Sequence, residues 1–305
     1  MSAVPATFLK RKVLNGWTLF WLVSGAICVA MVIETLRFDL SSPADVSHLI
    51  GFSVRLSVPF IYLVVAASAM PVLFPGAFST WLLRNRKYIG LCFAVAMAWQ
   101  GLFIFIMSGF HRDYYYEEIF YLRDELEGST GYLFLAAMVV TSFQFGRKFL
   151  DQQQWKLLHR SGVYFLWAYP FAVYWWSISY YGNPTLLDYV FYWTGFLAFA
   201  FRIAAWGKKR QAAASKTGLA VPVGSRAIGW ALVLAGLLFA ASSLYWQAPM
   251  TDFLLAPDWS ANLVLWLPFW PFEPFLSLFI IAAGTALLTR VSTRTSVSRQ
   301  EGQAA

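Results

Sequence analysis

The chain has 305 residues, of which 59% are hydrophobic, 19% aromatic and only 12% charged. Soluble domains carry about 25% charged residues, so this composition excludes an ordinary soluble protein and indicates one embedded in a membrane. The net charge of +8 does not indicate nucleic-acid binding, because the basic residues are spread over many short segments instead of one soluble face.

Apolar segments of about 20 residues, the length that crosses a bilayer as a helix, recur along the whole chain. We predict eight such spans and therefore an all-α, polytopic transmembrane helix bundle. The segments between the spans are too short for a soluble nucleotide-binding domain. The predicted spans are 15 to 35, 52 to 74, 88 to 108, 130 to 147, 161 to 180, 187 to 206, 227 to 246 and 272 to 289.

Lysine and arginine residues are concentrated in alternate segments between the predicted spans. With the N-terminus inside, the inner segments hold 18 of the 23 basic residues, and the acidic residues gather in the outer segments. Short cytoplasmic loops retain positive charge during insertion, so we expect both termini on the cytoplasmic side. The inner segment 207–226 is predicted to be a basic cytoplasmic loop.

The sequence contains three histidines. His48 and His111 belong to the predicted outer face, whereas His159 stands at the inner face where the fifth span begins. A hydrocarbon core about 30 Å thick separates the two faces. His159 therefore cannot share a metal or a haem with the other two histidines.

Among the ionisable residues within or beside predicted spans, two are the clearest cases. They are Arg55, near the outer end of the second span, and Glu273, which lies between Pro271 and Pro274. Burying a charge in hydrocarbon is costly, so both are candidates for a functional role. Glu273 is explained more simply as a carboxylate that complements the dipole in the first turn of a helix. Arg55 either extends to the outer headgroups or neutralises an anionic group such as a lipid phosphate.

Three further features have simple structural interpretations. Tyrosine and tryptophan residues cluster at span ends, as in the aromatic belts of membrane proteins. The segment 259–271 is apolar but broken by Pro268 and Pro271, so we expect it to lie along the outer interface. Cys28 and Cys92 fall inside the first and third spans, where we expect them to pack as small apolar side chains.

Three stretches, in chain order, resemble motifs of the ferric reductase-like transmembrane family. They are residues 86–91 (RKYIGL) before the third span, Thr141-Ser142 at the end of the fourth, and residues 155–160 (WKLLHR) at the start of the fifth. The first is similar to Arg-Arg-x-Leu-Gly-Leu and the last to Trp-x-x-Leu-His-Arg. These forms are typical of the branch that contains the haem-binding membrane subunit of the bacterial periplasmic methionine sulfoxide reductase system.

The resemblance covers about residues 50–205 and implies a six-helix core over residues 1–206. Residues 227–305, an additional transmembrane hairpin with a short cytoplasmic tail, lie beyond it. Such proteins hold haem b through histidines on the third and fifth spans and pass electrons across the bacterial inner membrane. The electrons would come from a quinol or a flavoprotein partner and go to a periplasmic acceptor, since this chain has no flavin or nicotinamide domain.

The sequence departs from the family pattern at the haem ligands. Gln100 stands where the histidine of the third span is expected, and Ala172 where the second histidine of the fifth span is expected. Of the family histidines, only His159 is present. Bis-imidazole ligation needs a histidine from each helix at matching depth. Haem b would therefore require five-coordinate binding at His159 or an unusual axial ligand such as Met97, with Arg55 available to neutralise a propionate.

Two functional hypotheses follow from these residues. In the first, the protein is a membrane electron-transfer component, in which His159 would ligate a haem iron and Gln100 and Arg55 would contact the cofactor. In the second, it is a haem-less relative that acts as a scaffold, sensor or assembly subunit and binds a lipid or a quinone in the vacated cavity. A transporter is less favoured, because no internal repeat is evident.

Overall fold

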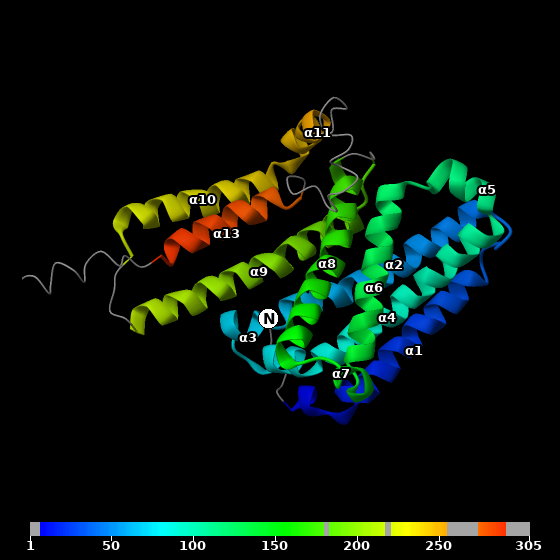
Figure 1. The fold of residues 1–305 in the computed structure, drawn as a ribbon, viewed down its shortest axis with the longest axis horizontal. Helices are drawn as coiled ribbons and strands as arrows, with labels where there is room; N and C mark the ends of the chain where they lie inside the picture. The colour runs from blue at the N-terminus through cyan, green and yellow to red at the C-terminus, as the bar shows by residue number, and fades with distance from the viewer. Residues whose placement is uncertain (1–6, 180–182, 217–220, 255–273, 291–305) are drawn as a thin grey trace, which may run out of the picture.

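The structure of the protein is a computed structural model that describes residues 7–179, 183–216, 221–254 and 274–290. All regular structure in these ranges is helical, and no strand occurs in them. The helices form one elongated bundle, in which α9, α10 and α13 extend away from α1, α2 and α4 (Figure 1). The predicted all-helical fold is confirmed.

The first group of helices comprises α1, α2 and α4, with α2 packed against α4 and α1 against both. Two short turns, η1 (Phe8–Lys10) and η2 (Lys12–Leu14), precede them. Ser42 and Pro43 begin the second helix of the group, since the Ser42 hydroxyl caps its first turn and proline suits the first helical position. The helices are α1 (Gly16–Thr35), α2 (Pro43–Ala66), the short α3 (Met70–Leu73) and α4 (Ala77–Phe110).

A polar contact fastens the start of α1 to α4. Asn85 is 1% exposed, and its side-chain amide donates to the side-chain oxygen of Asn15 at 3.0 Å. Its own oxygen accepts from the backbone N–H of Gly16 at 2.9 Å. Gly16 has a φ of +64°, a conformation that glycine adopts without strain. These bonds satisfy buried polar groups and fix where the first helix begins.

The remaining helices cross beside and beyond this group. α6 packs against α8, and α9 contacts both α8 and α2. α10 lies along α13, and α13 in turn packs on α9. Their bounds are α5 (Arg112–Tyr114), the π-helical turn η3 (Tyr115–Ile119), α6 (Leu122–Thr141), α7 (Gln144–Arg147), α8 (Gln152–Ser179), α9 (Leu186–Lys216), α10 (Val223–Ala241), α11 (Ser243–Leu254) and α13 (Leu276–Leu288).

Five of the described helices, namely α1, α2, α4, α9 and α10, are long and apolar enough to cross a membrane. α13 is apolar but has only 13 residues, and α6 and α8 carry more polar residues. The protein is thus a multi-pass helical membrane protein that exposes apolar side chains to lipid. The count of eight membrane spans, one for each predicted segment, stays a prediction.

Helix α9 continues to Lys216, so the first half of the predicted loop 207–226 is helical. The reason is local: residues 208–216 contain neither glycine nor proline and are mostly lysine, alanine and glutamine, which favour helix. The predicted span ends at residue 206, where the basic residues begin. The helix α9 continues past that point to Lys216.

Aromatic side chains fill the interior between α8 and its neighbours. Phe171 is fully buried and stacks on Tyr192 of α9, with ring centroids 5.3 Å apart. Trp167 stacks on Phe171 and Phe199 at 4.9 and 4.4 Å, and its indole N–H donates to the carbonyl of Gly195 at 2.9 Å. This part of the bundle is closely packed.

Glycines bring α10 and α13 into backbone contact. A Cβ added at Gly284 would lie 2.6 Å from the carbonyl oxygen of Gly229, and one added at Gly229 would lie 2.9 Å from that of Gly284. Small residues at such crossings let membrane helices approach closely. The two helices therefore depend on these positions for their packing.

We expect Gly284→Ala to destabilise the hairpin by about 1–3 kcal/mol, because the new methyl group meets backbone atoms that cannot move aside. The thermal midpoint of the detergent-purified protein measures this effect. Gly25→Ala is the matched control: Gly25 lies in α1 with open space around it, and alanine favours helix. Equal midpoints for the two variants would contradict the packing.

Candidate functional site

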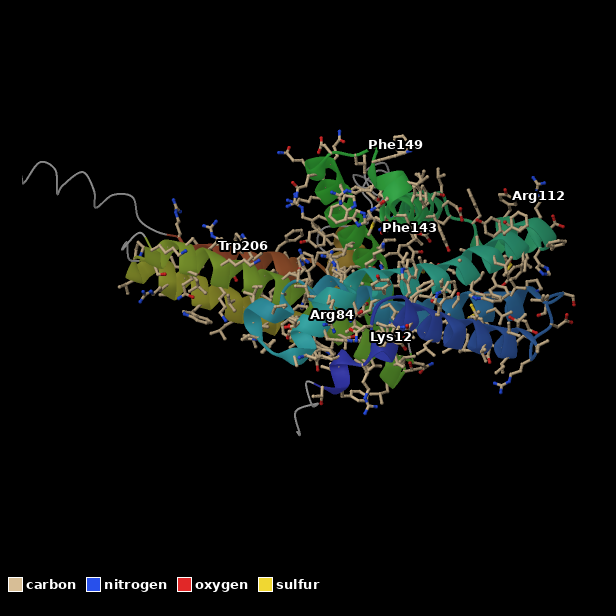
Figure 2. The ribbon with its side chains drawn as sticks, turned by 90° about the horizontal axis from the view of Figure 1, so that it is seen from below. Lys12, Arg84, Arg112, Phe143, Phe149 and Trp206 are labelled. Carbon is tan, nitrogen blue, oxygen red and sulfur yellow. The ribbon has the colours of Figure 1, made fainter. Side chains whose placement is uncertain are left out.

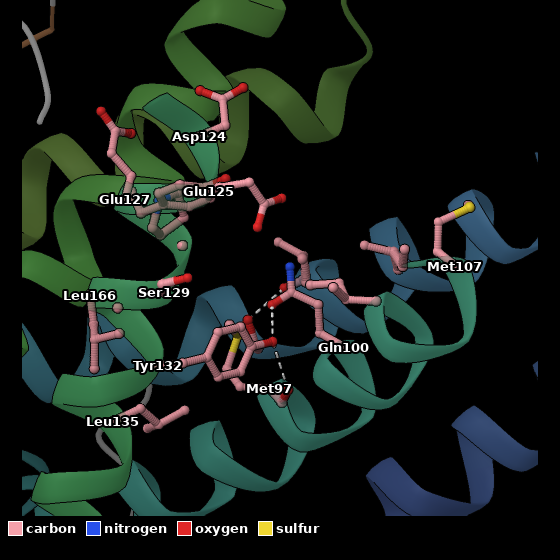
Figure 3. Close-up of a pocket in the computed structure, with 18 of the residues that line it drawn as sticks. Met97, Gln100, Met107, Asp124, Glu125, Glu127, Ser129, Tyr132, Leu135 and Leu166 are labelled. Carbon is pink, nitrogen blue, oxygen red and sulfur yellow. Dashed lines mark hydrogen bonds between the residues drawn. The ribbon is translucent and has the colours of Figure 1, made fainter. Parts of the chain in front are cut away.

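A cavity of about 370 Å³ lies between α2, α4, α6 and α8. Its walls are mostly apolar, with Val54 from α2, Phe93 from α4, Leu135 from α6 and Phe165 from α8. Figure 3 shows the α4 and α6 sides of the cavity, where Gln100 and Tyr132 lie next to each other and are joined by a hydrogen bond. A cavity of this size and lining suits a small, largely apolar molecule.

Gln100 and Tyr132 form the polar pair in the cavity wall. The Tyr132 hydroxyl shares its proton between the side-chain oxygen of Gln100, at 3.0 Å, and the carbonyl of Met97, at 3.1 Å. With its oxygen held by Tyr132, the Gln100 amide keeps its two N–H groups for other partners.

Carboxylates from the first turns of α6 line one end of the cavity. Asp124, Glu125 and Glu127 belong to this acidic end. The helix dipole favours acids at an amino terminus. Arg123 pairs with Glu127 at 3.1 Å, and their side chains are 13% and 9% exposed. This end of the cavity is therefore negatively charged and partly shielded from water.

Tyr115 closes the acidic end from the turn that follows α4. Its hydroxyl donates to a carboxylate oxygen of Glu125. Burial, followed by the hydrogen bond and the negative charge of Glu125, raises the pKa of Tyr115. Tyr115 therefore stays protonated at physiological pH and acts as a hydrogen-bond donor.

Pro170 of α8 also lines the cavity, together with Leu166 one turn earlier. Proline has no backbone N–H, so the carbonyl of Leu166 lacks its usual helical donor.

His159 lies away from the cavity, at the opposite end of the bundle. Its Nε2 atom is 3.0 Å from the hydroxyl of Thr141, and its ring centroid is 4.3 Å from that of Trp155. Trp155 donates its indole N–H to the carbonyl of Thr141 at 3.1 Å. The second and third motif stretches thus meet and fasten the end of α6 to the start of α8.

The protonation state of His159 follows from its surroundings. The residue precedes the predicted span 161–180, and burial, followed by the positive charges of Arg86 and Arg147, lowers its pKa to about 4. The Thr141 hydroxyl also lies 2.7 Å from the carbonyl of Ala137, to which it donates. The hydroxyl oxygen therefore accepts from Nε2–H, and the imidazole is neutral at physiological pH.

The other candidates lie apart from the cavity and from His159. Arg55 is exposed on α2, beside Gly51, and does not line the cavity. His48 pairs with Glu34 at 3.1 Å, and His111 lies 2.8 Å from the carbonyl of Leu40. Glu273 and the segment 259–271 are outside the described residues.

The residues present do not fit a haem held by two imidazoles. His159 is engaged by Thr141 at one end of the bundle, whereas Gln100 lines the cavity and is engaged by Tyr132. Ala172 is 7% exposed and stands next to Phe171 in the packed aromatic interior. Among the described residues, no group of three or more His, Cys, Asp or Glu side chains is placed to hold a metal ion.

Comparison of the chain with protein-family models, with curated proteins and with solved structures gives no match. The resemblance to the ferric reductase-like family therefore rests on the three motif stretches and stays a prediction.

The acids and Tyr115 at the acidic end of the cavity were not singled out from the sequence, and neither were Tyr132 and Arg202. Tyr132 orients Gln100, and Arg202 of α9 lies at the same end of the bundle as His159. Arg202 had a visible signal, since it is an arginine inside the predicted span 187–206. Tyr132 had none, because one tyrosine among many at span ends resembles an ordinary belt residue.

We expect the purified protein to show no Soret band that shifts on reduction with dithionite. We expect the same of the double variant Gln100→His/Ala172→His, because position 172 adjoins packed aromatic side chains instead of the cavity. A Soret band that shifts on reduction of the unmodified protein would contradict this expectation. A loss of that band in His159→Ala would then assign the iron ligand to His159.

Proposed function

We propose that the protein is a membrane-embedded binding subunit, related to the ferric reductase-like family but without its haem, whose cavity takes a quinone. The observation that carries this proposal is the Gln100–Tyr132 pair in the wall of an otherwise apolar cavity. A quinone head is a flat apolar ring with carbonyl oxygens, so it needs apolar walls and an N–H donor.

The amide of Gln100 is the donor that suits a quinone carbonyl. Tyr132 fixes the amide by its oxygen, which leaves the N–H groups of Gln100 as donors in the cavity wall. A hydrogen bond made away from water is stronger than one at the surface. Gln100 is thereby assigned to ligand binding, in place of a role beside a haem.

The acidic end of the cavity argues against the phosphate head of an anionic lipid as the occupant. Asp124, Glu125 and Glu127 line that end, and like charges brought together in a partly buried site repel strongly. A neutral quinone head meets no such repulsion. A role in electron transfer would then depend on partner proteins, a flavoprotein donor or a periplasmic acceptor.

A short-chain ubiquinone analogue, added to the detergent-purified protein and followed by quenching of tryptophan fluorescence, tests the proposal. We expect Gln100→Leu to weaken binding by about tenfold, the loss expected of one buried hydrogen bond. Gln144→Leu, at an exposed position on α7, should bind as the unmodified protein does. Equal affinities for the two variants would contradict the assignment, as would displacement of the analogue by a neutral diacyl lipid.

We further propose that α1, α2, α4, α6, α8, α9, α10 and α13 are the eight spans and that both termini face the cytoplasm of a bacterial cell. In a background in which Cys28 and Cys92 are replaced by alanine, a membrane-impermeant thiol reagent should label Ser41→Cys in intact cells. Gln153→Cys should react only after the cells are opened. The reverse pattern would contradict the orientation, and labelling of both positions in intact cells would contradict the span count.

A further inference from the structure

Three arginines come together around the start of α8, at the end of the bundle opposite the acidic end of the cavity. Arg86 comes from α4, Arg147 from α7 and Arg202 from α9, and all three are half-buried. Arg86 and Arg147 both lie within electrostatic range of the His159 ring. We name these three residues the arginine cluster. Arg86 follows Arg84 near the start of α4. Figure 2 shows Lys12 and Arg84 close together near the middle of the molecule, with Arg112 at the opposite end of α4.

Arg202 is fixed in place by neutral groups. One guanidinium nitrogen donates to the carbonyl of Val65 at 3.1 Å and to the hydroxyl of Ser68 at 2.8 Å. The guanidinium also lies over the ring of Tyr164, 4.8 Å from its centroid. None of these partners carries a negative charge, so the charge of Arg202 is held rigidly but is not neutralised.

Arg86 lies near the start of α4, which packs along α2, and the end of α2 carries the Arg202 partners Val65 and Ser68. The positive charges of Arg86 and Arg202 therefore repel each other. Arg147 lies over the ring of Trp155, 4.3 Å from its centroid, a contact that also supplies no negative charge. Among the described residues, Glu34 and Glu127 at the acidic end of the bundle form ion pairs, and the three arginines form none. The arginine cluster therefore has no carboxylate partner in the part of the chain that the structure describes.

Half-buried cations brought together without an anion are unfavourable, because each loses hydration and repels the others. The guanidinium group is the side chain best suited to phosphate, to which it donates two parallel hydrogen bonds. Arg202 also lies near the cytoplasmic end of a predicted span, which is the depth of lipid headgroups. Basic pockets between helices at that depth bind anionic headgroups.

We propose that the arginine cluster binds a phosphate group and that the headgroup of an anionic phospholipid supplies it. Arg202 is preset by Ser68 and Val65, while Arg86 and Arg147 are available to complete the site. The neutral His159, held by Thr141, borders the site without adding charge. This site is separate from the quinone cavity, so the failure of either proposal leaves the other standing.

The experiment compares thermal midpoints of the full chain in neutral detergent supplemented with phosphatidylglycerol or with phosphatidylcholine. We expect phosphatidylglycerol to raise the midpoint well above the value in phosphatidylcholine. Arg86→Gln should weaken the apparent affinity for phosphatidylglycerol by about tenfold, the loss expected of one charge-assisted contact. Arg226→Gln removes the same charge from an exposed position on α10 and should leave the affinity unchanged.

The lipid-free midpoint separates binding from a structural role. Arg86 makes no described hydrogen bond or ion pair within the protein and is repelled by Arg202, so Arg86→Gln should not lower the midpoint in neutral detergent. Equal phosphatidylglycerol affinities for Arg86→Gln and Arg226→Gln would overturn the proposal.

A parallel measurement with inorganic phosphate in neutral detergent distinguishes a lipid headgroup from free phosphate as the bound group. Stabilisation by phosphatidylglycerol but not by millimolar inorganic phosphate supports the lipid. Stabilisation by inorganic phosphate, with phosphatidylglycerol no better than phosphatidylcholine, overturns the lipid source and leaves a phosphate site for a soluble ligand.

Discussion

Hydrocarbon cannot solvate charge, and this constraint decides where the ionisable residues of the chain lie. The helices present apolar and aromatic side chains along their length, and charged residues gather at the two ends of the bundle. Arg86, Arg147 and Arg202 lie towards one end, and the carboxylates of Asp124, Glu125 and Glu127 lie at the other. Burial in lipid thus fixes the fold and the electrostatics of both candidate sites.

The two ends satisfy their charges in different ways. At the acidic end, Arg123 neutralises Glu127, and Tyr115 donates to Glu125, so the carboxylates are held in place beside the cavity. At the basic end, aromatic rings, hydroxyls and carbonyls contact the arginines, and none of them carries charge. One end therefore suits a neutral ligand in the bundle, and the other suits an anion from the membrane surface.

The positions of the helices could be predicted from apolar length, since a span must hide its backbone from lipid whatever its neighbours are. The ends of the helices could not be predicted in this way. Charged residues mark where a span leaves the membrane, but backbone hydrogen bonding continues beyond that point, as α9 shows by running to Lys216. The sites were only partly predictable. Gln100 was identified because it replaces an expected histidine, whereas Tyr132 and Arg202 act through contacts between helices that one sequence does not reveal.

The central claim is that the ligand site lies at Gln100, away from the motif residues around His159. Photo-crosslinking with an azido-quinone, followed by mass spectrometric mapping of the labelled peptides, tests this claim most directly. We expect the azido-quinone to label the part of α4 that carries Met97 and Gln100 and the facing part of α6. Labels concentrated around Trp155 and His159, in excess over a non-quinone azide, would contradict it.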